Sequence, residues 1–297
     1  MTRPYFSVVT PSWNQGSWIE GCIKSVLSQG VTDFEHIVLD NCSSDETEQV
    51  LARYPHLHVI READRGQSHA LNKGFQRARG EIICWVNADD QYLPETFARI
   101  RKEFERPEVA VVYGDCEEDF CDGSPPRLRK ARWTRREDLL VWWEKRTDLL
   151  QPAVFFRRSV LDEAGPLRED LYVVMDTEFW WRVSQRHEFV SVGVPLARQQ
   201  RQPESKTIKH MSKIYEEKAK VFGPLLDAAE PGRRVLNAAR RRRGMGRRWL
   251  GLAQSALNAD PKIARDFLGR ARAENPLLVL SARWWRAWML ARNPKPN

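Results

Sequence analysis

The 297-residue chain contains no uninterrupted apolar run close to the roughly 20 residues that a membrane-spanning helix requires. Its first residues, Met1 to Pro4, lead directly into a short apolar stretch and lack the long apolar core and small-residue cleavage site of a signal peptide. Its five cysteines are scattered, and Cys116 and Cys121 have no second Cys or His pair at zinc spacing. We therefore expect a cytoplasmic protein, either free or peripheral on the inner face of the membrane, without a disulfide framework or structural zinc.

A glycine-rich phosphate loop is also absent. No G-x-G-x-x-G follows the first apolar run, and there is no Walker A sequence. These absences argue against a dehydrogenase and a P-loop enzyme. A nucleotidyltransferase is disfavoured because the glycine- and arginine-rich loop expected after its first strand is missing. Any nucleotide site in this chain must work without a glycine-rich cradle.

The net charge of +8 is distributed unevenly along the chain. From Lys206 onward there are 21 Lys and Arg against 7 Asp and Glu, which leaves 27 and 33 of the totals of 48 and 40 for the first 205 residues. A mildly acidic body is thus joined to a strongly basic tail, and the two regions need separate explanations.

Strand and helix patterns alternate over residues 1–115. Short apolar runs predict strands at 6–10, 36–39, 57–60, 81–86 and 109–113. One-face helical spacing predicts helices between them, two of which begin at the apparent capping boxes Ser17/Glu20 and Ser43/Glu46. Repeated βα units with continuous apolar strands predict a mostly parallel sheet covered on both faces.

Polar residues follow three of these predicted strands, at 10–15, 40–45 and 87–90. Ligands of such sheets bind beyond the carboxyl ends of the strands. Asn87-Ala88-Asp89-Asp90 is the sharpest of the three groups, because carboxylates aimed into that crevice suit Mg²⁺ or Mn²⁺. The alternative is that Asp89 and Asp90 only cap the turn and the following helix.

The alternation of strand and helix patterns ends after residue 115. Residues 116–150, with Trp133, Trp142 and Trp143, are interpreted as an insertion over the site whose tryptophans either stack on sugar rings or belong to the core. Strands are predicted at 154–156 and 189–194, with a helix at 176–186 between them. Beyond 205 the pattern is helical, and its predicted breaks include Gly244 to Gly246.

Five blocks together resemble the family 2 glycosyltransferases in order and spacing. They are SVVTPSWNQ (7–15), DNCSSDET (40–47), DRGQSHALNKG (64–74), WVNADD (85–90) and MDTEFWWR (175–182). The resemblance implies the A-type glycosyltransferase fold, a mostly parallel central sheet flanked by helices, here with a C-terminal helical extension. It also implies a catalytic domain at 1–205, with a nucleotide-binding half at 1–115 and an acceptor half at 116–205, followed by a basic helical region at 206–297.

The resemblance also implies roles for individual residues. The expected donor-binding residues are Thr10, Pro11, Asn14, Asp40, Asp64, Gly66, Gln67, Asn72, Asn87 and Ala88. Asp89 is the expected ligand of Mg²⁺ or Mn²⁺, with Asp90 as a helper. Asp176 is the expected catalytic base, and Glu178 is a weaker candidate. A turn or helix-capping role is the alternative for several of them, namely Asp40, Asp64, Gly66, Gln67, Asn72, Asp89, Asp90 and Asp176, and for Asp176 it is compatible with catalysis.

Two positions depart from the family pattern. Asn87 replaces the first carboxylate of the common D-x-D form, and Met175 replaces the acidic residue that usually precedes the base. The expected function is an inverting transfer of a sugar from a nucleotide-diphosphate donor, a UDP-sugar by resemblance, to a glycan or lipid-linked acceptor in bacterial cell-envelope polysaccharide or glycolipid assembly. The two departures support an alternative, a sugar-nucleotide- or glycan-binding scaffold without turnover.

The basic tail has its own candidate partner. Arg240 to Arg243, with Arg247 and Arg248, carry much of its charge, and tryptophans alternate with arginines in residues 283–290. Tryptophan beside arginine suits an anionic membrane surface. The competing interpretation is that the tryptophans pack on the catalytic domain. Nucleic-acid binding is disfavoured, because no recognisable binding module accompanies the charge.

Overall fold

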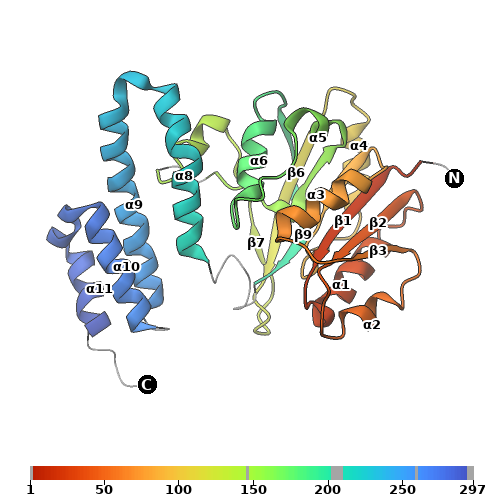
Figure 1. The fold of residues 1–297 in the computed structure, drawn as a ribbon, viewed down its shortest axis with the longest axis horizontal. Helices are drawn as coiled ribbons and strands as arrows, with labels where there is room; N and C mark the ends of the chain where they lie inside the picture. The colour runs from red at the N-terminus through yellow and green to blue at the C-terminus, as the bar shows by residue number, and fades with distance from the viewer. Residues whose placement is uncertain (1–2, 145–146, 202–209, 258–259, 293–297) are drawn as a thin grey trace. The chain divides into compact units, whose positions relative to one another are not determined.

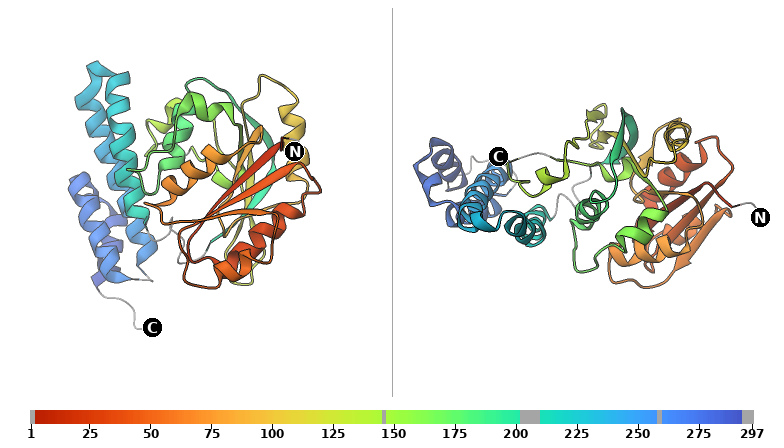
Figure 2. Two further views of the ribbon diagram at one scale, coloured as in Figure 1. Left: turned by 45° about the vertical axis from the view of Figure 1, so that its right-hand side comes forward. Right: turned by 90° about the horizontal axis from the view of Figure 1, so that it is seen from above.

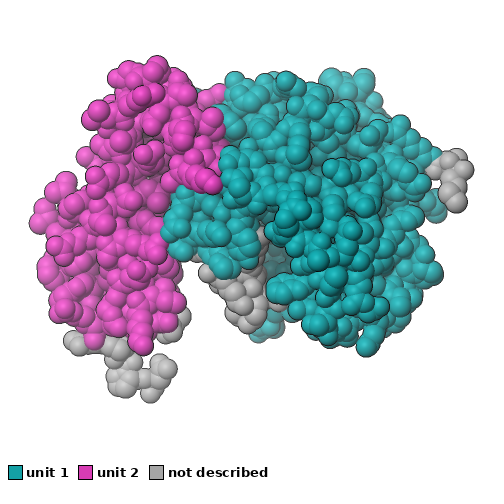
Figure 3. All heavy atoms as spheres, viewed as in Figure 1, with its two compact units in different colours: residues 1–136, 147–217 teal, residues 137–146, 218–297 magenta. Residues whose placement is uncertain are grey.

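The computed structural model describes residues 3–144, 147–201, 210–257 and 260–292. The chain forms two compact units (Figure 3): residues 1–136 and 147–217 make the first, and residues 137–146 and 218–297 make the second. The second unit therefore begins later than the expected boundary at 206. It also includes a segment expected in the acceptor half, because Trp142 and Trp143 are buried within the helical unit. Among the described residues, no helix has the length and apolar character to cross a membrane.

One nine-stranded sheet organises the first unit (Figure 1). Its strands are β1 (Phe6–Ser12), β2 (Phe34–Asp40), β3 (Leu57–Arg61), β4 (Ile82–Trp85), β5 (Gln91–Tyr92), β6 (Val111–Asp119), β7 (Arg127–Arg129), β8 (Val154–Arg157) and β9 (Phe189–Gln200). The order is β3-β2-β1-β4-β8-β6-β9-β5, with β7 paired to β6. Strands β1 to β4, β6 and β9 share one direction, and β5, β7 and β8 oppose it. The sheet is mixed but mostly parallel, which confirms the expected fold class.

Helices cover both faces of this sheet (Figures 1 and 2). They are α1 (Gly16–Leu27), α2 (Thr47–Leu51), α3 (Gln67–Arg77), α4 (Thr96–Phe104), α5 (Ser159–Ala164) and α6 (Met175–Val183), with a 3₁₀ turn, η2 (Gln151–Ala153). The two predicted capping boxes are wrong, because neither α1 nor α2 has a side-chain cap from its own N-cap residue. The carboxylate of Asp45 instead accepts a hydrogen bond from the Gly16 N–H at 2.9 Å, so one loop caps the helix that follows another strand.

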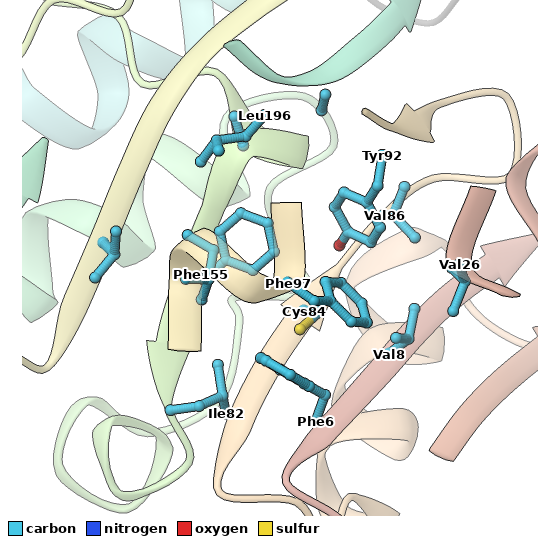
Figure 4. Packing of buried hydrophobic residues seen from close by; sticks show 14 of the residues in the cluster. Phe6, Val8, Val26, Ile82, Cys84, Val86, Tyr92, Phe97, Phe155 and Leu196 are labelled. Carbon is cyan, nitrogen blue, oxygen red and sulfur yellow. The ribbon is translucent and has the colours of Figure 1, made fainter. Parts of the chain in front are cut away.

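The face covered by α1 and α4 holds an extensive apolar core (Figure 4). Val8, Cys84 and Phe155 come from neighbouring strands and pack with Val26 of α1 and Phe97 of α4. All five side chains are fully buried. The uninterrupted apolar sequence of these strands is therefore explained by burial on both sides.

The opposite face is covered by α3 and α6. Phe75 of α3 lies edge-on to Trp85 and Phe156, with ring centroids 6.3 and 6.0 Å away, and Phe156 also packs against Phe179 and Trp180 of α6. Adjacent strand residues such as Phe155 and Phe156 serve opposite faces because side chains alternate along a strand. Both α3 and α6 are thus fixed on the same side of the sheet.

The second unit is helical. Its elements are η1 (Arg136–Leu139), which begins one residue before it, most of α8 (Met211–Ala229), η3 (Pro231–Arg233), α9 (Arg234–Ala256), α10 (Pro261–Glu274), η4 (Pro276–Leu280) and α11 (Ala282–Arg292). The predicted break at Gly244 to Gly246 is wrong, because α9 runs through it. A β-carbon at Gly244 would lie 2.0 Å from Trp143 Cδ1, so this glycine provides room for the tryptophan. Trp142 and Trp143 are core residues of this unit.

Candidate active site

The loops after β1 and β2 are tied to each other at the carboxyl edge of the sheet. Asn14, in the left-handed region at φ 51°, donates its backbone N–H to Ser43 Oγ at 2.8 Å, and its Oδ1 accepts from the Ser44 N–H at 2.9 Å. Asparagine tolerates this conformation better than most residues. Asn14 is exposed and Pro11 is half-buried, so both reach the surface at the predicted donor edge.

Asp40 ends β2 and is buried to 1% exposure. Its carboxylate accepts from the Ser43 hydroxyl and backbone N–H, and Arg61 Nε at the end of β3 lies 3.4 Å from it. Its side chain therefore positions the loop and Arg61, and direct contact with a nucleoside is not available to it in this arrangement. Neither Ser43 nor Arg61 was predicted from the sequence as a site residue.

The loop after β3 joins the same edge. The Asp64 N–H donates to Asn41 Oδ1 at 2.8 Å, and Asp64 Oδ1 accepts from the Gly66 N–H at 2.7 Å. Gly66 immediately precedes α3 and has φ 122°, which a residue with a side chain rarely adopts. Asp64, Gly66 and Gln67 are half-buried, so part of each remains open to a ligand.

Asn87 connects this loop to the turn after β4. Its Oδ1 accepts from Gln67 Nε2 at 2.8 Å and from Trp85 Nε1 at 3.2 Å. Its Nδ2 donates to Asp90 Oδ2 at 3.1 Å and to Gln151 Oε1 at 3.0 Å. Because an indole N–H can only donate, the orientation of the Asn87 amide is fixed. The amide oxygen already has two donors, and the predicted role of Asn87 in donor binding stays a prediction.

Asp89 and Asp90 have different environments in the same turn. Asp90 is 4% exposed, and burial together with the neighbouring Asp89 raises the pKa of its carboxyl well above the ordinary value. Asp89 is half-buried, and partial desolvation raises its pKa, which the charge of Arg201 opposes. Asp89 is therefore the carboxylate of this turn that a cation can reach, and Asp90 is a supporting residue bonded to Asn87.

Arg201 follows β9 and was not assigned a partner from the sequence. It donates to Glu118 Oε1 from Nε at 2.9 Å, and Arg129 bonds the same carboxylate oxygen at 2.8 Å. Its charge also opposes the rise that burial causes in the pKa values of Asp89 and Asp90. The basic residues after the last predicted strand, Arg198, Arg201 and Lys206, are candidates from the sequence to assist the leaving diphosphate. Arg198 pairs with Glu117 at 2.7 Å, and Lys206 lies outside the described residues. Of the two described arginines, Arg201 is the one whose charge acts on the acidic turn.

Asp176 lies in the first turn of α6, half-buried, with its Oδ1 accepting from the Thr177 N–H at 2.6 Å. Five residues, 184–188, separate α6 from β9, and Trp180 lies edge-on to Phe189 with centroids 6.1 Å apart. The end of α6 is thus beside the start of β9. Strand β9 runs in the same direction as β1 to β4, so it begins at the edge opposite to their carboxyl ends. The nine-residue helix α6 is about 13 Å long and ends beside that start, so its first turn lies toward the carboxyl edge. The topology brings Asp176 to the edge that carries Asp64 and Asp89.

Four predicted site residues have internal roles instead. Thr10 is fully buried, and its hydroxyl lies 2.9 Å from His36 Nε2. Ala88 is buried in an apolar cluster with Ile19 and Val38. Asn72 bonds both the N–H and the C=O of Leu167, at 2.8 and 2.9 Å. The expectation that Thr10, Asn72 and Ala88 line the donor site is not supported.

Glu178 is the fourth of these residues. It is 5% exposed and makes a two-point ion pair with Arg182, with Oε1 2.9 Å from Nε and Oε2 3.0 Å from Nη2. Arg182 in turn donates to backbone carbonyls of the turn after α5. Glu178 is thus a structural residue, and its expected catalytic role is not supported. Met175 is 4% exposed, so its apolar side chain fits a buried position.

Sequence reasoning missed two further residues at this edge. Gln151 of η2 hydrogen-bonds to Asn87 and, at 2.7 Å, to the Trp85 carbonyl. It lies 64 positions after Asn87 in the chain, so no local sequence pattern indicates this partner. Trp13 in the loop after β1 is 63% exposed, which is unusual for so large an apolar side chain. It lies inside the first of the five blocks, so the family resemblance of that block could have identified it.

Taken together, the fold and this edge define an α/β transferase-like protein with a polar ligand edge and no glycine-rich phosphate loop. Residues 7–165 match the family described as Glycosyl transferase family 2, more than half of the chain. The chain belongs to glycosyl transferase family 2 and is a glycosyltransferase.

Several relatives support this membership. An uncharacterized protein, MT1568, of Mycobacterium tuberculosis is 31% identical over 62% of this chain, and the match spans 63% of that protein's length. A PGL/p-HBAD biosynthesis glycosyltransferase of Mycobacterium bovis is 29% identical over 60% of this chain and 69% of its own.

Solved structures share the fold. TarS residues 1–349 of Staphylococcus aureus, solved with UDP-GlcNAc, gives a TM-score of 0.56 at 19% identity over 96% of this chain and 79% of that one. The mannosyltransferase PcManGT of Pyrobaculum calidifontis, solved with GDP-Man and Mn²⁺, gives 0.53 at 20% identity over 100% of this chain and 89% of that one.

Proposed function

We propose that this chain is an inverting glycosyltransferase that moves a sugar from a UDP-sugar to a hydroxyl group of a glycan or lipid-linked acceptor of the cell envelope. The observation that carries the proposal is the junction of four loops at one edge of the sheet, which Asn14, Ser43, Asn41 and Asn87 tie together by hydrogen bonds. Membership of the family supplies the reaction class. The names of two relatives support the acceptor class: a PGL/p-HBAD biosynthesis glycosyltransferase of Mycobacterium bovis and a putative teichuronic acid biosynthesis glycosyltransferase, TuaG, of Bacillus subtilis.

The donor is proposed to bind across the loops after β1, β3 and β4. Trp13 is an exposed ring at this edge, and we assign it the face of the nucleobase, because bases stack on aromatic side chains. Pro11, Asn14, Asp64, Gly66 and Gln67 are the remaining donor candidates that reach the surface there. Asp40 and Asn87 support them from behind through the bonds described above.

The residues present fit a divalent cation that the donor helps to hold. Among the described residues, no cluster of three or more His, Cys, Asp or Glu side chains forms a complete metal site. Mg²⁺ and Mn²⁺ are, however, commonly held by one or two carboxylates together with substrate phosphates and water. Asp89, a partly desolvated carboxylate with a raised pKa, is suited to be that ligand. A cation bound there would neutralise charge on the leaving nucleoside diphosphate.

Asp176 is proposed to accept the proton of the acceptor hydroxyl as its oxygen attacks the anomeric carbon. Direct displacement from the face opposite the leaving group inverts the anomeric configuration. A carboxylate in the first turn of a helix is held ionised by the helix dipole, and a positioned base contributes roughly 10²–10⁴ in rate. The direction of α6 supports a place for it at the carboxyl edge.

The test is release of nucleoside diphosphate from UDP-glucose, UDP-galactose, UDP-N-acetylglucosamine and GDP-mannose, with Mn²⁺ or Mg²⁺ and with glycan and lipid-linked acceptors. We expect metal-dependent release with a UDP-sugar, and loss of most of it in Asp89→Ala and Asp176→Asn. Asp162→Asn, which changes an exposed carboxylate of α5, is the matched control. The anomeric configuration of the product, determined by proton NMR, tests inversion.

The scaffold alternative predicts a different result. Donor binding measured by calorimetry without release under every condition would favour it. The structure weakens the two observations behind it, because Asn87 is fully used in hydrogen bonds and Met175 is buried. Neither departure from the family pattern then needs loss of turnover as its explanation.

A further inference from the structure

The last helix of the second unit presents an unusual outward face. The inner face of α11 is formed by Trp284, Ala287 and Ala291, all buried. Its outward face carries Trp285 at 47% exposure and Met289 at 55%. These two residues are four positions apart and therefore project side by side from the helix.

The short helix before α11 adds two further apolar side chains. Leu277 and Leu280 of η4 are 66% and 79% exposed. A 3₁₀-helix has three residues per turn, so these two leucines project on the same side of η4. Exposed apolar side chains thus occur on two consecutive elements that contact each other, and contiguous apolar groups of this kind are typical of interaction surfaces.

Arginines alternate with these apolar residues. Residues 275–292 contain Arg283, Arg286 and Arg292 and no Asp or Glu. In the part of the chain that the structure describes, none of the three is paired with a carboxylate. Arg283 contacts Gln254 at 3.4 Å, and Arg292 lies 4.1 Å from the centre of the Trp288 ring. Their charge is therefore available to an external partner.

The longer arginine run of α9 has a different role. Arg240 pairs with Glu144 at 3.0 Å, Arg242 bonds the Ala273 carbonyl at 2.9 Å, and Arg248 donates to the Trp142 carbonyl at 3.0 Å. Three of its arginines thus hold the helical unit together. The charge that distinguishes α11 is smaller in amount but lies next to exposed tryptophan and methionine.

We propose that the outward face of α11, with Leu277 and Leu280 of η4, is a docking surface for an anionic lipid bilayer. Tryptophan is stable at the level of the headgroups, where its ring is buried and its N–H remains hydrated, and arginines beside it attract anionic lipids. The helix lies flat in the interface, with Met289 and the two leucines in the upper acyl region.

Lipid fits this face better than other partners. A second copy of the chain would bring three more arginines against the same face, with no acidic residue to pair them. A nucleic-acid backbone would satisfy the arginines but would leave Met289, Leu277 and Leu280 in contact with a charged surface. An anionic bilayer satisfies both the charge and the apolar area. The inference concerns a surface of the second unit and does not depend on the reaction proposed above.

The experiment is co-sedimentation of the full chain with vesicles of phosphatidylcholine alone or with 30% phosphatidylglycerol, at 50 and 300 mM NaCl. We expect binding to the anionic vesicles at low salt, weaker binding at high salt and little binding to the neutral vesicles. The double variant Trp285→Ala/Met289→Ala should weaken binding about tenfold, because it removes the inserted apolar area. Arg283→Gln/Arg286→Gln should weaken it at low salt and reduce its salt dependence.

Matched variants distinguish this surface from general stickiness. Leu27→Ala/Val59→Ala removes exposed apolar groups from the first unit, and Arg77→Gln/Arg99→Gln removes two exposed charges there. Both should bind like the parent chain. Thermal unfolding should show that all four variants remain folded. The proposal is overturned if the parent fails to bind anionic vesicles at low salt, or if the α11 variants bind as well as the parent. It is also overturned if a DNA duplex binds more tightly than vesicles and depends on the arginines alone.

Discussion

The two units of this glycosyltransferase place their polar groups in opposite ways. In the first, amide and carboxylate side chains gather at one edge of the sheet and bond to one another across loops, as Asn87 does with Gln67, Asp90 and Gln151. In the second, charged groups lie on helix surfaces, and the interior is built from tryptophan against glycine and alanine, as Trp143 against Gly244. Substitutions at the sheet edge should therefore change chemistry first, and substitutions inside the helical unit should change stability first.

The largest expected effect separates two acidic residues on one turn of α6. Asp176→Asn should lower kcat by about 10²–10⁴ with little change in the free energy of unfolding, because it removes a proposed base. Glu178→Gln should leave kcat nearly unchanged but lower the free energy of unfolding by about 2 kcal/mol. Breaking a buried ion pair costs about 3–5 kcal/mol, and the partial exposure of Arg182 reduces this.

Initial rates and urea unfolding measured on both variants decide this comparison. If Glu178→Gln lost activity as strongly as Asp176→Asn at unchanged stability, the assignment of the two roles would be reversed.

A second comparison lies within α9. Gly244→Ala should destabilise the protein by about 1–3 kcal/mol, because its β-carbon would lie 2.0 Å from the Trp143 ring. Gly251→Ala, in the same helix, meets nothing within 4 Å and should be neutral or stabilising by up to about 1 kcal/mol. Thermal unfolding measures both. Equal melting temperatures for the two variants would show that Trp143 does not pack against Gly244 in solution.

The sequence predicted the elements of the first unit well where local periodicity decides them. The one-face pattern of α3 and the apolar runs of β1, β2 and β4 appear as expected, because buried faces require apolar residues at fixed spacing. The capping boxes failed, because the Gly16 N–H is capped by Asp45 from another loop and the sequence carries no local sign of that partner.

Site residues were predicted less completely for the same reason. Asp89 and Asp176 have motif neighbours that identify them, whereas Gln151 contributes through contacts 64 and 66 positions away. Thr10 and Ala88 lie inside the recognised blocks but are buried, Thr10 within β1, both of whose faces are covered, and Ala88 in the turn after β4. A motif thus identifies the segment, and the backbone decides which of its side chains reach the ligand.

The third prediction concerns Asn87, at the position where the common motif has a carboxylate. Asn87→Asp should not raise turnover and should lower it about tenfold. The new carboxylate would lose the Nδ2 donor to Gln151 and would face the buried Asp90, and like charges at this distance disfavour each other. Rates over a Mn²⁺ titration measure this, with Asn87→Ala as the variant that removes the network without adding charge. Higher turnover in Asn87→Asp, or half-maximal activity at a lower Mn²⁺ concentration, would mean that the position can act as a metal ligand.

The smallest expected effect tests the packing beneath the site. Burial lowers the pKa of His36 to about 3, so the imidazole is neutral in the folded protein and is held against Thr10. In the unfolded chain its pKa is near the ordinary 6.5, and the stability that depends on the neutral form is present above that value and is lost as the pH falls toward 3. From pH 7 to 5.5 the contribution of His36 should fall by about 1.2 kcal/mol.

The difference between the parent and His36→Gln isolates this term, because other titrating groups are common to both proteins. Urea unfolding at the two pH values should therefore show a smaller loss in His36→Gln. His58→Gln, at an exposed position, should behave like the parent. An equal pH dependence in all three proteins would mean that His36 takes up a proton in the folded state, and that the interior below Thr10 and the donor edge is more open to water than its complete burial indicates.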